Sequence, residues 1–226
     1  MKKILILLIV IPFILFSQVK DKNYYSNIGR GLGYCYGNET TIDLIIEKYP
    51  TLAKKAMMSI LKFDRAHKKA IENMENIYTK ELGISISKLK DEVVDRASTQ
   101  NDFSFSEANF YLENFEDNRI KGNHKLLSEF VQIILSHNPY YQLVPSKEFL
   151  DGFNNVFHSD NHPKSKGLNL SIEYPKSWTQ EEGKRPNVLA VLKNSQKNCH
   201  INLIITDLLK GMDKDINTLS DEDLKY

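Results

Sequence analysis

The stretch from residue 51 to residue 83, TLAKKAMMSILKFDRAHKKAIENMENIYTKELG, is the strongest structural signal in the chain. Its apolar residues recur at steps of three and four, with lysines and glutamates between them, which is the period of an amphipathic α-helix. The expected buried face consists of Ile60, Phe63, His67, Ala70, Met74, Ile77 and Tyr78. Gly83 follows this face and predicts the end of the helix.

Shorter helices on both sides extend this signal into a helical domain over residues 38–153. Before the long helix, TIDLIIEKY can form a short helix that is capped by Asn38 or Thr40 and broken by Pro50. After it come SKLKDEVVDRA, FSEANFYLENFEDN, HKLLSEFVQIILSH and a last turn in PSKEFLDGF. The short connections between these segments predict a small helical bundle.

The period of the sequence changes after residue 154. Residues 154–166, NNVFHSDNHPKSK, are polar and predict a linker. From residue 167, GLNLSIEYP alternates apolar and polar residues, and NVLAVLKN and CHINLIITDL are further strand candidates. The expected fold class is therefore α+β, a small N-terminal helical bundle followed by an antiparallel sheet domain over residues 167–226. Three strands bury little core, so we expect this domain to be incomplete or to pack on the bundle.

The stretch LNLSIEYPKSW, residues 168–178, resembles the opening of PsbP-like domains. An alternating strand ends there at Tyr174-Pro175 and is followed by Trp178. The resemblance covers about residues 166–210 and implies an antiparallel sheet flanked by helices, in an exported protein without enzymatic activity. It assigns no functional residue to this chain. Trp178 itself is either a ligand-stacking residue or an apolar plug at the end of the sheet, and the plug is favoured.

The first 17 residues have the order of a secretory signal peptide. Two lysines precede an unbroken apolar run at residues 4–16, and the expected cleavage site lies between Ser17 and Gln18. As a helix this run reaches about 20 Å, less than the ~30 Å hydrocarbon core of a membrane. We expect a secreted or periplasmic protein with no stable membrane span after cleavage. The alternative is an uncleaved N-terminal anchor. The helical part resembles only uncharacterised secreted bacterial proteins.

Charge and composition restrict the class of partner. Removal of the leader, which carries two lysines and no acidic residue, changes the formal net charge from +1 to −1. Such a chain offers no electrostatic basis for nucleic-acid binding. The composition, 41% hydrophobic and 26% charged, is typical of a globular protein. The expected partner is therefore another protein or a component of the cell envelope.

Residues 18–37 are rich in glycine and tyrosine and overlap the stretch NIGRGLGYCYGNET. We expect a flexible segment, because its glycines follow no predicted strand and the lysine of a Walker-type phosphate loop is missing. The chain has two cysteines, Cys35 and Cys199. Outside the cytosol they can form one disulfide, or they can be two separate thiols, and the sequence leaves both alternatives open.

One short cluster has the residue types of a metal site. His158, Asp160 and His162 alternate in an extended segment, so two imidazoles and a carboxylate can point the same way. A solvated linker is the simpler interpretation. His67 can be a general base, although a core histidine is favoured. No pattern assigns a catalytic residue or a cofactor. The main hypothesis is an exported non-enzymatic binding or envelope-associated module, and the alternative is a secreted metal-dependent hydrolase that uses this cluster.

Overall fold

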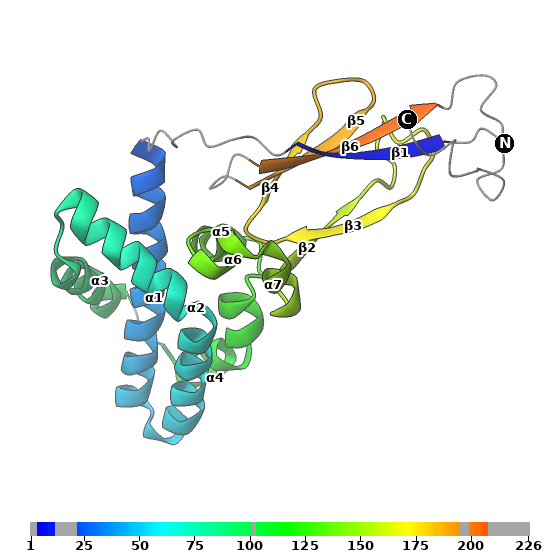
Figure 1. The fold of residues 1–226 in the computed structure, drawn as a ribbon. Coiled ribbons are helices and arrows are strands. Elements are labelled where there is room, and N and C mark those ends of the chain that lie inside the picture. Colours follow the sequence, from blue (N-terminus) through cyan, green and yellow to red (C-terminus); the bar gives the residue numbers. More distant parts are fainter. Residues whose placement is uncertain (1–3, 12–21, 101–102, 195–198, 208–226) are drawn as a thin grey trace.

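The protein combines a helical part with a smaller sheet part. The structure is a computed structural model that describes residues 4–11, 22–100, 103–194 and 199–207. Figure 1 shows the helices gathered on one side and the strands extending away from them. The α+β class expected from the sequence is confirmed, with the helical part first.

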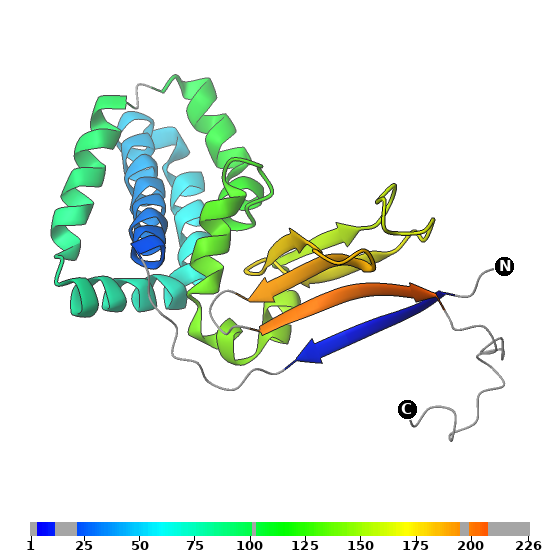
Figure 2. The same cartoon turned by 90° about the horizontal axis from the view of Figure 1, so that it is seen from above.

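Two long helices form the centre of the helical part. α1 covers Lys22–Lys48 and α2 covers Ala53–Leu82, and the short 3-10 helix η1, Pro50–Leu52, connects them. The buried face expected for α2 is confirmed: Phe63, His67, Ala70, Met74 and Ile77 all lie in it. α2 ends where the sequence predicts, because the residue after it, Gly83, takes the left-handed conformation (φ 67°) that side chains disfavour. Figure 2 shows α1 nearly end-on, with other helices around it.

The N-terminal half of α1 corrects one prediction. The segment expected to be flexible, residues 18–37, is helical from Lys22 onward, and the expected caps Asn38 and Thr40 lie in mid-helix. An apolar stripe at helical steps is buried along α1, formed by Ile28, Leu32, Cys35, Ile42 and Ile45. Each buried aliphatic side chain contributes about 1.5–3 kcal/mol, which outweighs the roughly 1 kcal/mol that a glycine costs in a helix.

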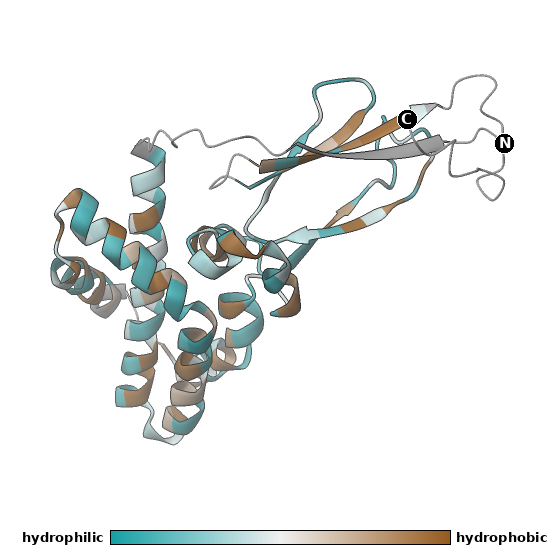
Figure 3. Ribbon diagram, viewed as in Figure 1, coloured by the Kyte–Doolittle hydropathy of each residue, from teal (hydrophilic) through white to brown (hydrophobic). Residues whose placement is uncertain are grey.

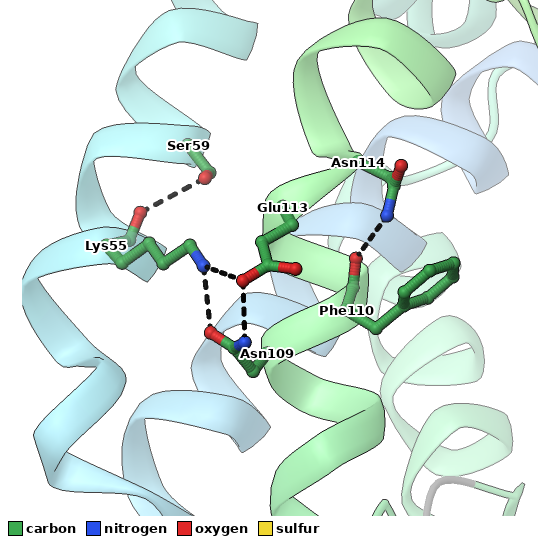
Figure 4. A network of polar contacts seen from close by, with 6 residues as sticks. All are labelled: Lys55, Ser59, Asn109, Phe110, Glu113 and Asn114. Carbon is green, nitrogen blue, oxygen red and sulfur yellow. Dashed lines mark hydrogen bonds and ion pairs between the residues drawn. The ribbon is translucent and has the colours of Figure 1, made fainter.

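Shorter helices complete the helical part. They are α3 Ile86–Gln100, α4 Phe105–Glu113, the π-helix η2 Glu116–Ile120, α5 Ser128–Ser136, α6 Pro139–Leu143 and α7 Pro145–Leu150. The start of α4 is capped, since Ser104 and Glu107 form a capping box. Lys55 of α2 donates to the Asn109 amide oxygen (2.8 Å) and to the Glu113 carboxylate (3.3 Å), which ties α4 to α2 (Figure 4). Within the described residues, no helix has both the length and the apolarity to cross a membrane.

The strands form two antiparallel sheets. One has the order β1-β6-β5-β4 and the other pairs β2 with β3. Their bounds are β1 Ile4–Ile11, β2 Asn154–His158, β3 Ser171–Pro175, β4 Thr179–Glu182, β5 Val188–Asn194 and β6 Cys199–Asp207. Phe157 and Tyr174 of the small sheet share one buried cluster with Leu189, Leu192 and Leu203 of the large sheet. Figure 3 shows apolar residues along β5 and β6.

Two segments of the sheet part differ from the predictions. The predicted linker, residues 154–166, begins with strand β2, because Phe157 is buried in the sheet cluster. The predicted leader contributes strand β1, which pairs with β6 over its whole length. The expected cleavage site at Ser17 and Gln18 lies outside the described residues, as does the end of the sheet domain, residues 208–226. Export of the chain stays a prediction.

A buried corner, residues 175–178, attaches the sheet part to the helical part. Ser177 donates its backbone N–H and its hydroxyl to the carboxylate of Glu148 in α7, each over 2.7 Å. Gln132 of α5 donates to the backbone carbonyl of Trp178 over 2.7 Å. The Trp178 side chain is 6% exposed and packs in the sheet cluster, which confirms the plug interpretation. Directed hydrogen bonds therefore fix how the two parts meet.

Candidate functional site: a groove between α1 and α3

The predicted metal ligands do not converge. His158 and Asp160 are exposed, and His162 is half-buried with its Nδ1 accepting a hydrogen bond from the backbone N–H of Lys164 (3.2 Å). The chain turns after β2, since the N–H of His162 donates to the carbonyl of Ser159 (3.0 Å), so the three side chains share no strand face. In the part of the chain that the structure describes, no three His, Cys, Asp or Glu residues are grouped to hold a metal ion.

The disulfide alternative is not formed either, because Cys35 and Cys199 are both free thiols. Cys35 is buried in the helical core, whereas Cys199 is half-buried beside the sheet cluster. Burial raises the pKa of the Cys35 thiol, which keeps it protonated. The structure therefore favours the alternative of two separate thiols, one in each part.

His67 lies in the core of the helical part. Its ring contacts those of Phe63 and Phe153, with centroid distances of 4.8 and 5.7 Å. Nε2 is 3.1 Å from the carbonyl oxygen of Ile120 and therefore donates to it, which leaves Nδ1 without a partner. Burial lowers the pKa of His67 to about 4, so the ring is neutral at pH 7. This environment favours the core interpretation over a general base.

A cavity in the helical part brings together charge, aromatic rings and a buried polar atom. It has a volume of about 500 Å³ and is lined by residues of α1, α3, α4, η2 and α5. A second cavity of about 380 Å³ shares four of these residues and continues along α1 and α3. We term the two cavities the α1–α3 groove. Its residues used below are Arg30, Gly33, Tyr34, Gly37, Asn38, Arg96, Phe103, Tyr111, Arg119 and Phe130.

Glycines of α1 form the floor of the groove. A Cβ atom at Gly33 or Gly37 would meet nothing within 4 Å, so both positions open into free space. A Cβ at Gly31 would instead lie 3.0 Å from Ile133 of α5 and 3.0 Å from Met74 of α2. The glycine-rich pattern therefore allows close packing of helices on one side of α1 and leaves room for the groove on another.

Three arginines from separate elements line the larger cavity: Arg30 of α1, Arg96 of α3 and Arg119 of η2. Arg30 pairs with the Glu129 carboxylate over 2.9 Å, and this pair raises the pKa of Arg30. Among the described residues that line this cavity there is no aspartate or glutamate. The described lining of the larger cavity therefore carries cationic side chains and no carboxylate.

Two tyrosines and the backbone hold Arg119 in place. Its guanidinium carbon lies 5.0 Å from the centroid of the Tyr111 ring and 6.0 Å from that of Tyr34. The Tyr34 hydroxyl donates to the backbone carbonyl of Arg119 over 3.0 Å. Burial raises the pKa of both tyrosines to about 12, so they are protonated donors at neutral pH. Arg119 is thus oriented before any ligand is present.

Asn38 supplies a buried donor on the wall of the larger cavity. The side chain is 2% exposed, and its Oδ1 accepts from the Tyr111 hydroxyl (3.0 Å) and the Arg119 guanidinium (3.5 Å). Because a guanidinium can only donate, the atom that faces it must be the oxygen, which fixes the orientation of the amide. Nδ2 then has no hydrogen-bond partner. A buried unpaired donor costs about 1–3 kcal/mol, so an acceptor placed there is favoured.

The sequence contains one overlooked signal for this groove. Gly29, Gly33 and Gly37 recur at four-residue steps, which places them on one face of a helix beside the apolar stripe. Recognising that stripe would have predicted α1 and a face without side chains. Arg96 and Arg119 carry no comparable pattern, because they come from elements that only the fold brings beside Arg30 and Asn38 of α1.

Comparisons with known proteins add no relative. A scan against family models, a search of the curated proteins and a search of the solved structures each give no match. The groove is therefore interpreted from its own geometry.

Proposed function

We propose that the protein is an exported, non-enzymatic binding module that holds a small ligand in the α1–α3 groove. The observation that carries the proposal is that Asn38, whose buried Nδ2 has no hydrogen-bond partner, lines a cavity of about 500 Å³ together with Arg119. Small-molecule sites have volumes of about 300–1,000 Å³ and mostly apolar walls with a few placed polar groups. The groove has this combination of volume, aromatic walls and polar atoms.

The chemistry of the groove favours binding over catalysis. The main polar groups of the larger cavity are arginines, an amide and tyrosines whose pKa is raised to about 12, while Glu92 lines the smaller cavity. Among the described residues that line the larger cavity there is no histidine, cysteine or carboxylate to act as nucleophile or general base. These groups orient and neutralise a ligand, and they offer no site for a proton transfer at neutral pH.

The export part of the proposal rests on the sequence of residues 1–17, and the relation of the sheet part to PsbP-like domains rests on residues 168–178. Export places the groove where components of the cell envelope are available as ligands. Mass spectrometry of the protein from its native source should find Gln18 as the first residue. Protein that retains Met1 would overturn the export part and leave the groove to be tested separately.

A thermal-shift screen of the full chain tests the binding proposal. The panel contains neutral, cationic and anionic aromatic compounds of similar size. At a hundredfold excess over Kd, a ligand adds about 2.7 kcal/mol and raises Tm by roughly 5–10 °C. At least one class should produce such a shift in the wild-type protein. If no class does, the proposal is wrong.

The matched variants fill the groove without disturbing the core. In the double variant Gly33→Leu/Gly37→Leu the new side chains start from positions with free space, and leucine is the better helix former. The variant should fold and lose the ligand-induced shift. Glu47→Leu places the same side chain on an exposed position of α1 outside the groove and should keep it. A shift that survives in the double variant would place the ligand elsewhere.

A further inference from the structure

We infer that the α1–α3 groove selects a small organic oxyanion, a carboxylate or phosphate carried on a flat, largely apolar body. This inference rests on the proposed function and names its ligand class. It follows from the charge of the larger cavity, the geometry of Arg119, the unpartnered amide of Asn38 and the shape of the floor and walls.

The charge of the cavity selects an anion. Arg30, Arg96 and Arg119 line it; Arg30 pairs with Glu129, whereas no described carboxylate lies at ion-pair distance from Arg119. A cavity between α2 and η2, of about 460 Å³, provides a contrast. There Glu116 is itself part of the lining and pairs with Lys62 over 2.7 Å, so a carboxylate already occupies the neighbourhood of the cations. An incoming anion gains most where the positive charge has no such neighbour.

Arg119 selects an oxyanion among anions. A guanidinium presents a planar fork of donors that matches two oxygens of a carboxylate or phosphate. The guanidinium carbon lies 5.0 Å from the Tyr111 ring centroid and 6.0 Å from that of Tyr34, which restricts where the fork lies, and the contact to Asn38 Oδ1 uses one nitrogen at 3.5 Å. The other donors of the fork remain for a ligand. A lysine would supply the charge without this geometry.

Asn38 completes the recognition of the oxygen atoms. Nδ2 belongs to the same amide whose Oδ1 meets Arg119. The amide and the guanidinium are therefore neighbours, and an oxyanion held by Arg119 lies within reach of a second donor. Since Nδ2 is buried without a partner in the ligand-free protein, satisfying it removes a cost and adds affinity.

The floor and walls select the body of the ligand. Gly33 and Gly37 carry no side chain, so a flat group can approach the backbone of α1 closely. Tyr34 and Phe130 are stacked at 5.1 Å with their planes 4° apart, and Phe103 also lines the cavity. Flat aromatic and aliphatic surfaces pack well on such rings. A compact inorganic ion would leave this surface uncovered.

Isothermal titration of the full chain with four probes tests the ligand class. The probes are 2-naphthoate, 2-naphthyl phosphate, 2-naphthamide and inorganic phosphate. We expect the first two to bind at least tenfold more tightly than the last two, and the tighter of the two to identify the preferred head group. Naphthamide binding as tightly as naphthoate would overturn the oxyanion inference, and inorganic phosphate binding as tightly would overturn the flat body. Either result would leave the proposed function intact, because a ligand would still occupy the groove.

Asn38→Asp is the decisive variant because it changes the donor into a negative charge at nearly constant shape. Tyr111 and Arg119 can still donate to the new carboxylate, so the helical part is retained. Binding of the naphthyl anions should fall at least tenfold. Asn118→Asp makes the same chemical change next to Arg119 but at a residue that does not line the groove, and it should leave affinity within twofold. Unchanged affinity in Asn38→Asp would overturn the inference.

Arg119→Lys separates charge from geometry. Lysine keeps the positive charge but loses the planar fork and the defined stack on the tyrosines. We expect Arg119→Lys to lower the affinity for naphthoate at least fivefold. This loss should change less with salt concentration than the loss caused by Arg119→Gln. Equal affinity of the wild-type protein and Arg119→Lys would show that charge alone attracts the ligand and would overturn the role of the fork.

Discussion

The helical part and the sheet part hold their residues together in different ways. In the helical part, one apolar stripe on α1 and another on α2 distribute the stabilisation over many neighbouring residues. The sheet part is attached to the helices through the corner at residues 175–178, where two hydrogen bonds from Ser177 meet one buried carboxylate. This difference predicts that a single substitution in the helical part has a small, local effect on stability. A substitution at the corner should instead affect the whole sheet part.

Glu148→Ala should give the largest effect. It removes the acceptor of two hydrogen bonds, each worth about 1.5–3 kcal/mol when one partner is charged, and leaves the buried Ser177 donors unpaired. We expect the docking of the sheet part to weaken by about 4 kcal/mol. Hydrogen exchange should accelerate in β3, β4 and β5, while the amides of α1 and α2 stay protected.

Glu113→Ala is the matched control for this change. Glu113 also accepts two side-chain hydrogen bonds, from Lys55 and Asn109, but it is exposed on α4 (Figure 4). Its loss should change the free energy of unfolding much less than the loss of Glu148, because water screens exposed ion pairs. Equal acceleration of exchange in both parts of the Glu148→Ala variant would contradict the comparison.

His67 should make the helical part sensitive to acid. Burial lowers its pKa from 6.5 to about 4, so below pH 6.5 the unfolded state binds a proton that the folded state does not. The contribution of neutral His67 to the free energy of unfolding is fully present above pH 6.5. As the pH falls to about 4, roughly 3 kcal/mol of this free energy is lost progressively. Urea unfolding at pH 7.5 and 4.5 measures this loss. His67→Leu should show a smaller difference between the two pH values, and an identical difference would refute the prediction.

The smallest expected effect distinguishes two faces of the same helix. Gly33→Ala places a Cβ in free space and should raise the free energy of unfolding by about 1 kcal/mol. Gly31→Ala places a Cβ 3.0 Å from Ile133 and Met74, and overpacking of this kind costs about 1–3 kcal/mol. Chemical denaturation of the two variants should therefore give changes of opposite sign. Changes of the same sign would mean that α1 does not divide the core from the groove.

The parts of the fold that could be predicted are those with a local period. The α2 face around Phe63 and Met74, its end at Gly83 and the alternation in residues 167–175 all follow from neighbouring residues, and the structure has them. The C-terminal half of α1 is predicted as a short helix, but its N-terminal half is not, because its glycines suggest flexibility, although Ile28 and Leu32 carry the same helical period. Strand β2 was missed because its burial depends on Phe157 alone.

The candidate site was less predictable than the fold. His158, Asp160 and His162 have suitable residue types for a metal, but a turn after β2 separates them, and spacing in the sequence does not reveal that turn. The groove combines Arg30 and Asn38 of α1 with Arg96 of α3 and Arg119 of η2, which become neighbours only in the folded protein. Residues that meet across separate helices leave no periodic trace.

The two free thiols have a practical consequence. Cys35 lies in the helical core and Cys199 beside the sheet cluster. Each part of the chain therefore contains one thiol whose alkylation reports local unfolding of that part. A buried, protonated thiol reacts with an alkylating reagent only after local unfolding, whereas a half-buried one reacts sooner. Mass spectrometry after brief alkylation would thus report which part opens first under heat or acid, without any added probe.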